Sequence, residues 1–209
     1  MTILYLVRHG QSVANLTNSF GGISDYELTD TGKLQAKLLS EYLKDINIDC
    51  IYSSDLSRAY NTILPTAKIK GIAINKNKNL REINGGIWEW QLFDDIANNY
   101  SNEFSVWKND TEHAYCPGGE SIDELRSRFF GEIEEIVKAN ENKSILAATH
   151  AMAIRTFLSK VYKKPVTEID WVSNASVSSF EYKNGSFFPI NIGFDNFLKG
   201  VRTTLGDNI

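Results

Sequence analysis

Three short apolar segments, each followed by polar residues, constrain the fold of this chain more than any other feature of its sequence. The segments are residues 3–7, 50–52 and 144–149. Continuous apolar runs of this length predict strands that are buried on both faces of a sheet. Helical patterns follow the segments along the chain, and strands that alternate with helices predict a three-layer α/β/α sandwich around a mostly parallel sheet.

The expected helices begin at polar residues that can accept hydrogen bonds from free backbone N–H groups. The first carries leucines and Tyr42 at helical spacing within residues 28–46. The expected N-caps are Asp30 or Thr31 for this helix, Ser53, Ser54 or Asp55 for a helix ending near Lys68, and Glu120 with Ser121 for a helix ending near Ala139. A further helix is expected directly after residue 150.

The end of the chain departs from this alternation. Residues 175–192 alternate with period two around Asn184-Gly185, which predicts a β-hairpin and makes the central sheet mixed. Residues 83–119 are rich in Asn, Gly and aromatic side chains, with a helix expected over 91–100, and we expect them to form a lid or insertion. We call them the lid segment. We expect residues 1–209 to form a single domain that ends, after Asp195, in a surface helix or frayed tail.

Composition excludes several classes of partner. The 209 residues carry a formal net charge of -4, with no basic run that would follow nucleic acid and no basic amphipathic helix for a membrane surface. The first apolar run is too short for a signal sequence, and no run approaches the length of a membrane span. Cys50 and Cys116 are too few for a disulfide framework or a zinc site. We therefore expect a cytoplasmic protein without nucleic-acid, membrane or metal partners.

Polar side chains follow the expected strands at the point where each strand ends. Arg8 and His9 follow the first, residues 53–58 follow the second, and His150 follows the third. Because ligands bind beyond the carboxyl ends of parallel strands, these residues are expected to meet in one site. Two arginines, Arg8 and Arg58, can form charge-assisted hydrogen bonds with phosphate oxygens. The site is therefore predicted to bind a phosphate group.

Backbone groups near the first strand are expected to help in binding this phosphate. Gly10 would let the backbone approach the anion closely, and residues 11–15 would open a helix whose free N–H groups favour negative charge. His9 is the candidate nucleophile, because an imidazole is substantially neutral near pH 7. Glu82 is the best placed carboxylate to protonate a leaving group, although its position alone favours an ordinary surface glutamate.

Five motifs, taken together, resemble the histidine phosphatase superfamily, which has the phosphoglycerate mutase-like fold. They read LVRHGQSVAN, YSSDLSRAYNT, LREINGG, PGGES and ATHAMAIR, and they occur in the family's order over most of the chain. The resemblance implies that His9 is the phosphorylated nucleophile, that Arg8 and Arg58 bind the phosphate, and that His150 stabilises the transferred group. It also implies that Glu82 is the general acid and then the base, that Asn15 touches the phosphate, and that no metal or other cofactor is needed.

Two positions depart from the family's pattern. Ala151 follows the second histidine where glycine is usual, and Trp90 ends the segment GIWEW where the family usually has glycine. Because alanine is small, we expect the helix and the activity to tolerate Ala151, whereas Trp90 puts substrate preference in doubt more than catalysis. Among the aromatic residues of the lid segment, we expect most to form a small core and Trp88 or Trp90 to line the substrate pocket. His113 is expected to be solvated, with a role at the site as the less favoured alternative.

Other chemistries fit the sequence less well. A cysteine-based phosphatase would need an arginine six positions after its cysteine, where this chain has Leu56 and Ile122. A phosphate-binding loop of the kinase type is absent from the sequence. Within the family, the compact length favours a phosphatase that hydrolyses small phosphomonoesters to release inorganic phosphate. A phosphoglycerate mutase and a low-turnover phosphate-binding module stay open, and so does the oligomeric state, a homodimer included.

Overall fold

A six-stranded mixed sheet forms the centre of the structure, a computed structural model that describes residues 1–204. The strand order is β3-β2-β4-β1-β5-β6. The pairs β2–β3, β2–β4 and β1–β4 are parallel, whereas β5 is antiparallel to both β1 and β6. The strands are β1 (Thr2–Arg8), β2 (Cys50–Ser53), β3 (Ile74–Lys76), β4 (Ser144–Thr149), β5 (Val177–Lys183) and β6 (Ser186–Phe194). This arrangement confirms the predicted α/β sandwich and the C-terminal hairpin.

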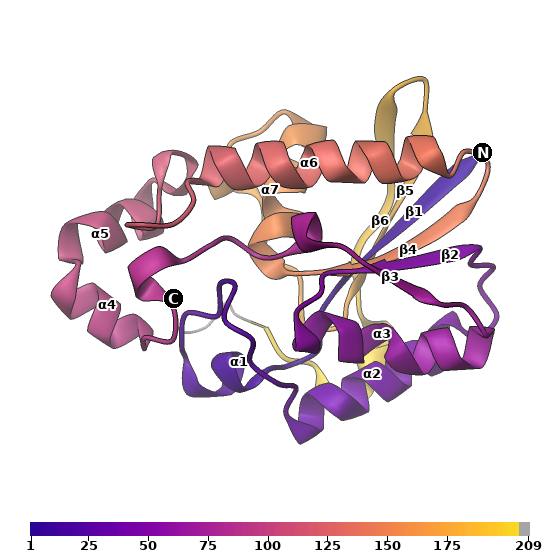
Figure 1. Ribbon diagram of the computed structural model, residues 1–209, viewed down its shortest axis with the longest axis horizontal. Coiled ribbons are helices and arrows are strands. Elements are labelled where there is room, and N and C mark those ends of the chain that lie inside the picture. Colours follow the sequence, from indigo (N-terminus) through magenta and orange to yellow (C-terminus); the bar gives the residue numbers. More distant parts are fainter. Residues whose placement is uncertain (205–209) are drawn as a thin grey trace.

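Helices cover both faces of the sheet, with α6 and α7 on one side and α2 and α3 on the other (Figure 1). Each face has its own hydrophobic core, and the buried strands β1 and β4 contribute side chains to both. The helices are α1 (Val13–Thr17), α2 (Asp30–Leu43), α3 (Ser57–Lys70), α4 (Phe93–Asn99), α5 (Ser101–Asn109), α6 (Ile122–Ala139) and α7 (Ala151–Tyr162). No helix in residues 1–204 is long and apolar enough to cross a membrane.

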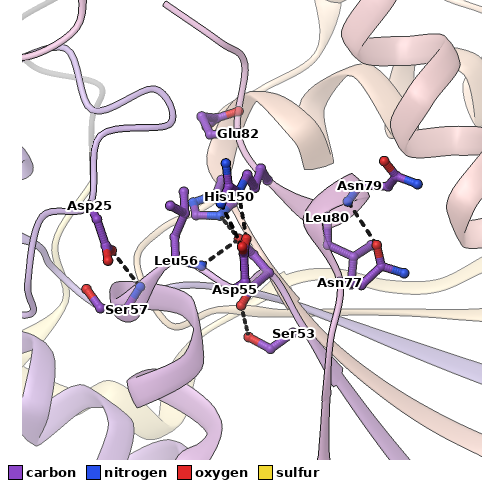
Figure 2. Close-up of polar contacts among 12 residues, drawn as sticks. Asp25, Ser53, Asp55, Leu56, Ser57, Asn77, Asn79, Leu80, Glu82 and His150 are labelled. Atoms are coloured by element: carbon purple, nitrogen blue, oxygen red, sulfur yellow. Dashed lines mark hydrogen bonds and ion pairs between the residues drawn. The ribbon is translucent and has the colours of Figure 1, made fainter.

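The structure corrects two of the expected helix N-caps. Helix α2 is capped by Thr29, whose side chain accepts the Gly32 N–H, and not by Asp30 or Thr31. Helix α3 follows Leu56, which provides no side-chain cap, and the Ser57 N–H instead donates to Asp25 from a distant loop (2.7 Å; Figure 2). Helix α6 begins after Ser121 as predicted, with Glu124 completing a capping box.

The lid segment forms helices α4 and α5, which lie at the end of the molecule opposite the N-terminus (Figure 1). The prediction of one helix over 91–100 was correct for α4 and missed α5. Aromatic rings from the lid segment pack around Phe20, which lies 5.6 Å from Trp88 and 5.5 Å from Trp107 between ring centroids. These rings are continuous with the hydrophobic core on the α6 and α7 face of the sheet, so the expected separate small core is corrected to an extension of the main one.

The chain after Asp195 continues as two short 3₁₀ turns over Asn196–Val201, separated by a kink at Lys199, where the sequence predicts a surface helix or frayed tail. The remainder of that predicted tail, residues 205–209, lies outside the described residues.

Candidate active site

The strand ends bring Arg8, His9 and His150 together at one edge of the sheet. Arg8 pairs in register with Thr149, and the His9 N–H donates to the Thr149 carbonyl at 2.9 Å. The ring centroids of His9 and His150 are consequently 5.2 Å apart. Parallel pairing of β1 with β4 is thus the direct reason why the two histidines meet.

Hydrogen bonding fixes the tautomer of His9. Its Nδ1 lies 2.7 Å from the carbonyl oxygen of Gly10, which can only accept, so Nδ1 carries the proton and Nε2 carries the lone pair. Burial, followed by the nearby charges of Arg58 and Arg8, lowers the pKa of His9 well below its ordinary value. His9 therefore presents a neutral imidazole with a free Nε2, which is the form required of a nucleophile.

Arg8 provides positive charge beside His9. The side chain is fully buried, and its Nη1 donates to the Val172 carbonyl at 2.5 Å. Its Nε and Nη2 have no hydrogen-bond partner within the described residues. Burial lowers the pKa of Arg8 to about 10, so the guanidinium remains charged near neutral pH. Buried donors without a protein partner are costly, and an anionic ligand would satisfy them.

Arg58, on the first turn of α3, holds the loop of residues 21–25 over the site. Its guanidinium donates to the carbonyl oxygens of Ser24 and Gly22 at 2.6 Å each and of Gly21 at 3.1 Å. Burial lowers its pKa to about 10, and the carboxylate of Glu82 opposes this shift. Arg58 is therefore both a buried charge beside the cavity and an anchor for a loop of the cavity wall.

Glu82 lies at the start of α7, directly beyond His150. Its carboxylate accepts hydrogen bonds from the N–H groups of Met152 at 2.9 Å and Ala153 at 3.1 Å, so it caps a helix whose N-cap residue makes no side-chain bond. Burial raises the pKa of Glu82, and these N–H groups offset part of that shift. A raised pKa increases the protonated fraction of Glu82 in the mildly acidic range, as a general acid requires.

The ring of His150 is held by Ser54, a contact that the sequence did not reveal. The Nε2 of His150 lies 2.9 Å from the Ser54 hydroxyl, which also accepts the Leu56 N–H at 3.3 Å. The hydroxyl proton is thus free to donate to Nε2, an arrangement that leaves the imidazole proton on the buried and unpartnered Nδ1. Burial and the charge of Arg58 lower the pKa of His150, which favours this neutral form.

Two further predicted site residues, Asn15 and Gly10, have different positions relative to the cavity. Asn15 lines the cavity, and its Oδ1 accepts hydrogen bonds from the Ser12 N–H and from Asn174. Gly10 is not free to bind an anion, because its N–H donates to Thr62 at 2.8 Å. A side chain at position 10 would also meet the Gly32 carbonyl at 2.8 Å, so close helix packing explains this glycine better than anion binding does.

Trp88 is corrected from a pocket residue to a core residue. Its side chain is fully buried against Phe20, Phe104 and Trp107, and it does not line the cavity. Trp90 is 60% exposed and packs on Tyr26, with ring centroids 4.4 Å apart. The backbone of Trp90 has φ 67, the left-handed region that favours glycine, which accounts for the glycine expected at this position.

Ala151 lies at the cavity, whereas His113 lies away from it. Ala151 is the first residue of α7 and lines the cavity, where its methyl group is accommodated. His113 is exposed on the lid segment and bonds to Asp110, away from the cavity. The less favoured role of His113 at the site therefore has no geometric support.

Glu89 is a structural residue of the site that sequence reasoning missed. Its carboxylate accepts hydrogen bonds from the N–H groups of Ile23 at 2.8 Å, Ser24 at 2.7 Å and Gly85 at 2.7 Å, and from the Ser24 hydroxyl. It therefore joins the 21–25 loop to the loop that follows Glu82. Its position in the motif GIWEW was the available signal, but the partners are backbone groups that no side-chain pattern reveals.

We expect Glu89→Ala to loosen the 21–25 loop and to destabilise the protein. Charge-assisted hydrogen bonds contribute about 1.5–3 kcal/mol each, and a chain of this size loses roughly 2–4 °C in melting temperature per kcal/mol. Loss of these four bonds therefore predicts a fall of at least about 10 °C in melting temperature, with a raised KM. Glu135→Ala, which removes an exposed carboxylate of α6, is the matched control. An unchanged melting temperature and KM for Glu89→Ala would contradict this role.

A cavity of about 70 Å³ lies beside His9, Arg58 and Glu82. Its titratable lining residues, which we call the floor, are His9, Arg58 and Glu82. Its large apolar lining residues, which we call the outer wall, are Phe20, Ile83, Phe93, Trp107, Met152 and Trp171. Ser12, Asn15 and Ser19 add uncharged polar groups to the lining. No cluster of three or more His, Cys, Asp or Glu side chains that could hold a metal ion occurs in the part of the chain that the structure describes. The wall residues that sequence reasoning missed are Phe20, Ile83, Met152 and Trp171.

Comparisons with known proteins agree with this geometry. The model of the histidine phosphatase superfamily (branch 1) matches residues 4–192, and the chain belongs to this family. Phosphoserine phosphatase 1 of Hydrogenobacter thermophilus is 34% identical over 155 residues, 74% of each chain. A probable phosphoglycerate mutase, GpmB, of Yersinia pestis is 32% identical over 165 residues, 79% of this chain and 77% of its own.

Solved structures give the same fold. Bacillus stearothermophilus YhfR superposes with a TM-score of 0.92 at 25% identity, covering 95% of this chain and 100% of its own. Phosphoserine phosphatase from Entamoeba histolytica superposes with a TM-score of 0.79 at 27% identity, covering 95% of this chain and 100% of its own. The phosphoglycerate mutase-like fold and the family predicted from the five motifs are both confirmed. The relatives include proteins named as phosphatases and as mutases.

Proposed function

We propose that this protein is a phosphomonoesterase that works through a phosphohistidine on His9. The observation that carries the proposal is a neutral His9 with its proton held on Nδ1, beside a buried Arg8 whose Nε and Nη2 have no partner among the described residues. A phosphate group bound to these donors would place its phosphorus beside Nε2. The small substrate is a phosphorylated metabolite, and the product is inorganic phosphate.

The reaction proceeds in two steps. In the first, Nε2 of His9 forms a bond to phosphorus, the P–O bond to the organic group breaks, and Glu82 gives its proton to the departing oxygen. In the second, the Glu82 carboxylate takes a proton from a water molecule, whose oxygen attacks phosphorus and breaks the P–N bond. Inorganic phosphate leaves, and both His9 and Glu82 return to their starting protonation states.

Positive charge for the transferring phosphoryl group comes from this chain's own side chains. Arg8 and Arg58 carry full charges, and the Nδ1–H of His150 would donate to a phosphoryl oxygen. These three groups take the part that a metal ion plays in other phosphoryl-transfer sites. We therefore propose that the reaction needs no metal ion. We also propose that residues 1–209 form a single domain and that the lid segment covers its cavity. A cytoplasmic location is proposed as well, since the two cysteines are unpaired.

The proposed function predicts hydrolysis of p-nitrophenyl phosphate in the presence of excess chelator, with equal release of p-nitrophenol and inorganic phosphate. Loss of activity on chelation would contradict the metal-independent mechanism. Relatives named as phosphoglycerate mutases favour mutase activity as a second candidate. An assay of 3-phosphoglycerate primed with 2,3-bisphosphoglycerate separates the two, and we expect it to give little 2-phosphoglycerate.

The pKa directions of His9 and Glu82 predict an acidic pH optimum. The lowered pKa of His9 keeps the nucleophile neutral below pH 6.5, and the raised pKa of Glu82 keeps the acid protonated above its ordinary range. As pH rises through the pKa of Glu82, kcat/KM for an alkyl ester such as 2-phenylethyl phosphate should fall. Because p-nitrophenolate leaves without a proton, its ester should show a weaker fall. Identical pH profiles for both esters would contradict the role of Glu82.

A further inference from the structure

The outer wall of the cavity is built from apolar side chains that several distant segments contribute. Phe20 follows α1, Phe93 begins α4, Trp107 lies on α5, and Met152 lies on α7. Trp171 comes from the segment before β5. Phe20 links the set, with ring centroids 5.7 Å from Phe93 and 5.5 Å from Trp107. Three of the wall side chains, Phe20, Phe93 and Trp107, therefore form one packed aromatic cluster.

Positive charge is confined to the floor of this cavity. Arg58 is the only Lys or Arg among the described residues that line the cavity, and three loop carbonyls engage its guanidinium. Arg155, which stacks on Trp171 with its guanidinium 4.4 Å from the ring, donates its Nε–H to the Ile169 carbonyl. Glu82 adds a carboxyl group to the lining. A substrate carboxylate placed against the wall would lose water, and no Lys or Arg among the described wall residues would pair with it.

We infer that the organic group of the substrate is apolar or aromatic and carries no charge of its own. This inference rests on the proposed function and deepens it, since it selects among the esters that a phosphatase of this site could hydrolyse. An aryl or alkyl-aryl group would be buried against Phe20, Phe93 and Trp171, whereas phosphoserine or phosphoglycerate would bring a carboxylate to the same surface. The site thus differs in preference from what the names of its phosphoserine phosphatase and mutase relatives would suggest.

Three alkyl phosphates test the inference without a large difference in leaving-group reactivity. They are 2-phenylethyl phosphate, which is aromatic, glycerol 3-phosphate, which is small and uncharged outside its phosphate, and 3-phosphoglycerate, which adds a carboxylate. We expect kcat/KM to fall in this order, with the phenylethyl ester ahead of 3-phosphoglycerate by roughly 100-fold or more. A kcat/KM for 3-phosphoglycerate equal to or above that for glycerol 3-phosphate would overturn the inference.

Variants of the wall locate the preference. Phe93→Ala and Trp171→Ala, both at partly exposed side chains, should each lower kcat/KM for the phenylethyl ester by about tenfold while leaving glycerol 3-phosphate within about twofold. Phe188→Ala, at an exposed aromatic residue of the edge strand β6, is the control and should change neither. If both wall variants keep the wild-type preference, the wall does not select the substrate. If the wild type hydrolyses none of the three esters or p-nitrophenyl phosphate, the proposed function fails and the inference falls with it.

Discussion

The variant His9→Ala is expected to lose phosphatase turnover by about 10⁴-fold or more, because no other group in the site can take the phosphoryl group from the ester. His9 alone combines a neutral ring, a proton fixed on Nδ1 and a free Nε2. The second histidine is tied to Ser54 through its Nε2. The loss should therefore appear in kcat with p-nitrophenyl phosphate, while the protein remains folded.

The matched control for this variant is His113→Ala, which removes an exposed histidine of the lid segment. It should keep wild-type kcat and KM. Thermal denaturation of both variants shows whether the protein still folds, since His9 contributes a single side-chain hydrogen bond to the Gly10 carbonyl. If folded His9→Ala retained more than about a tenth of the wild-type kcat, the assignment of His9 as the nucleophile would be wrong.

The variant Glu82→Gln is expected to separate esters by the basicity of their leaving groups. Loss of a general acid lowers rates by about 10²–10⁴-fold when the leaving group needs a proton. We therefore expect kcat/KM for 2-phenylethyl phosphate to fall by this amount, whereas kcat/KM for p-nitrophenyl phosphate falls far less. The amide that replaces the carboxylate in this variant keeps one oxygen that can accept one of the two α7 N–H groups, so half of the helix cap is preserved.

The same variant should also show a burst. Because Glu82 is proposed to activate water in the second step, its loss would let the phosphoenzyme accumulate and release about one p-nitrophenol per site before slow turnover. Glu135→Gln, at an exposed carboxylate of α6, should show neither effect. An equal loss with both esters and no burst would mean that Glu82 serves only to cap α7.

The chemistry at the floor of the site could be predicted because it follows from strand ends. Arg8, His9 and His150 directly follow apolar runs, and parallel pairing then places them together. Two histidines at strand ends, with arginines beside them, predict a phosphate-binding site from the sequence alone. Arg58 was predicted in the same way from the end of the second strand, whereas the role of Glu82 was predicted through the family resemblance, since spacing alone favoured a surface residue.

The cavity wall and the loop contacts could not be predicted, because they depend on side chains meeting backbone groups across the fold. Glu89 binds N–H groups 65 and 66 positions earlier in the chain. Trp88 or Trp90 was expected to line the pocket. Phe20 lines it instead, and Trp88 packs against the Phe20 ring. The start of α3 was misplaced for a similar reason, since Asp25 from another loop accepts the hydrogen bond that a local cap would accept.

The most direct test of the central claim is identification of the phosphorylated residue. Glu82→Gln would be mixed with p-nitrophenyl phosphate in excess chelator, quenched in alkali at the end of the burst, and mapped by peptide mass spectrometry. The mechanism predicts one phosphoryl group per chain on His9, stable in alkali and lost in acid, and none in the double variant that also carries His9→Ala. A phosphoryl group on any other residue, or continued hydrolysis by the double variant at the single variant's rate, would contradict it.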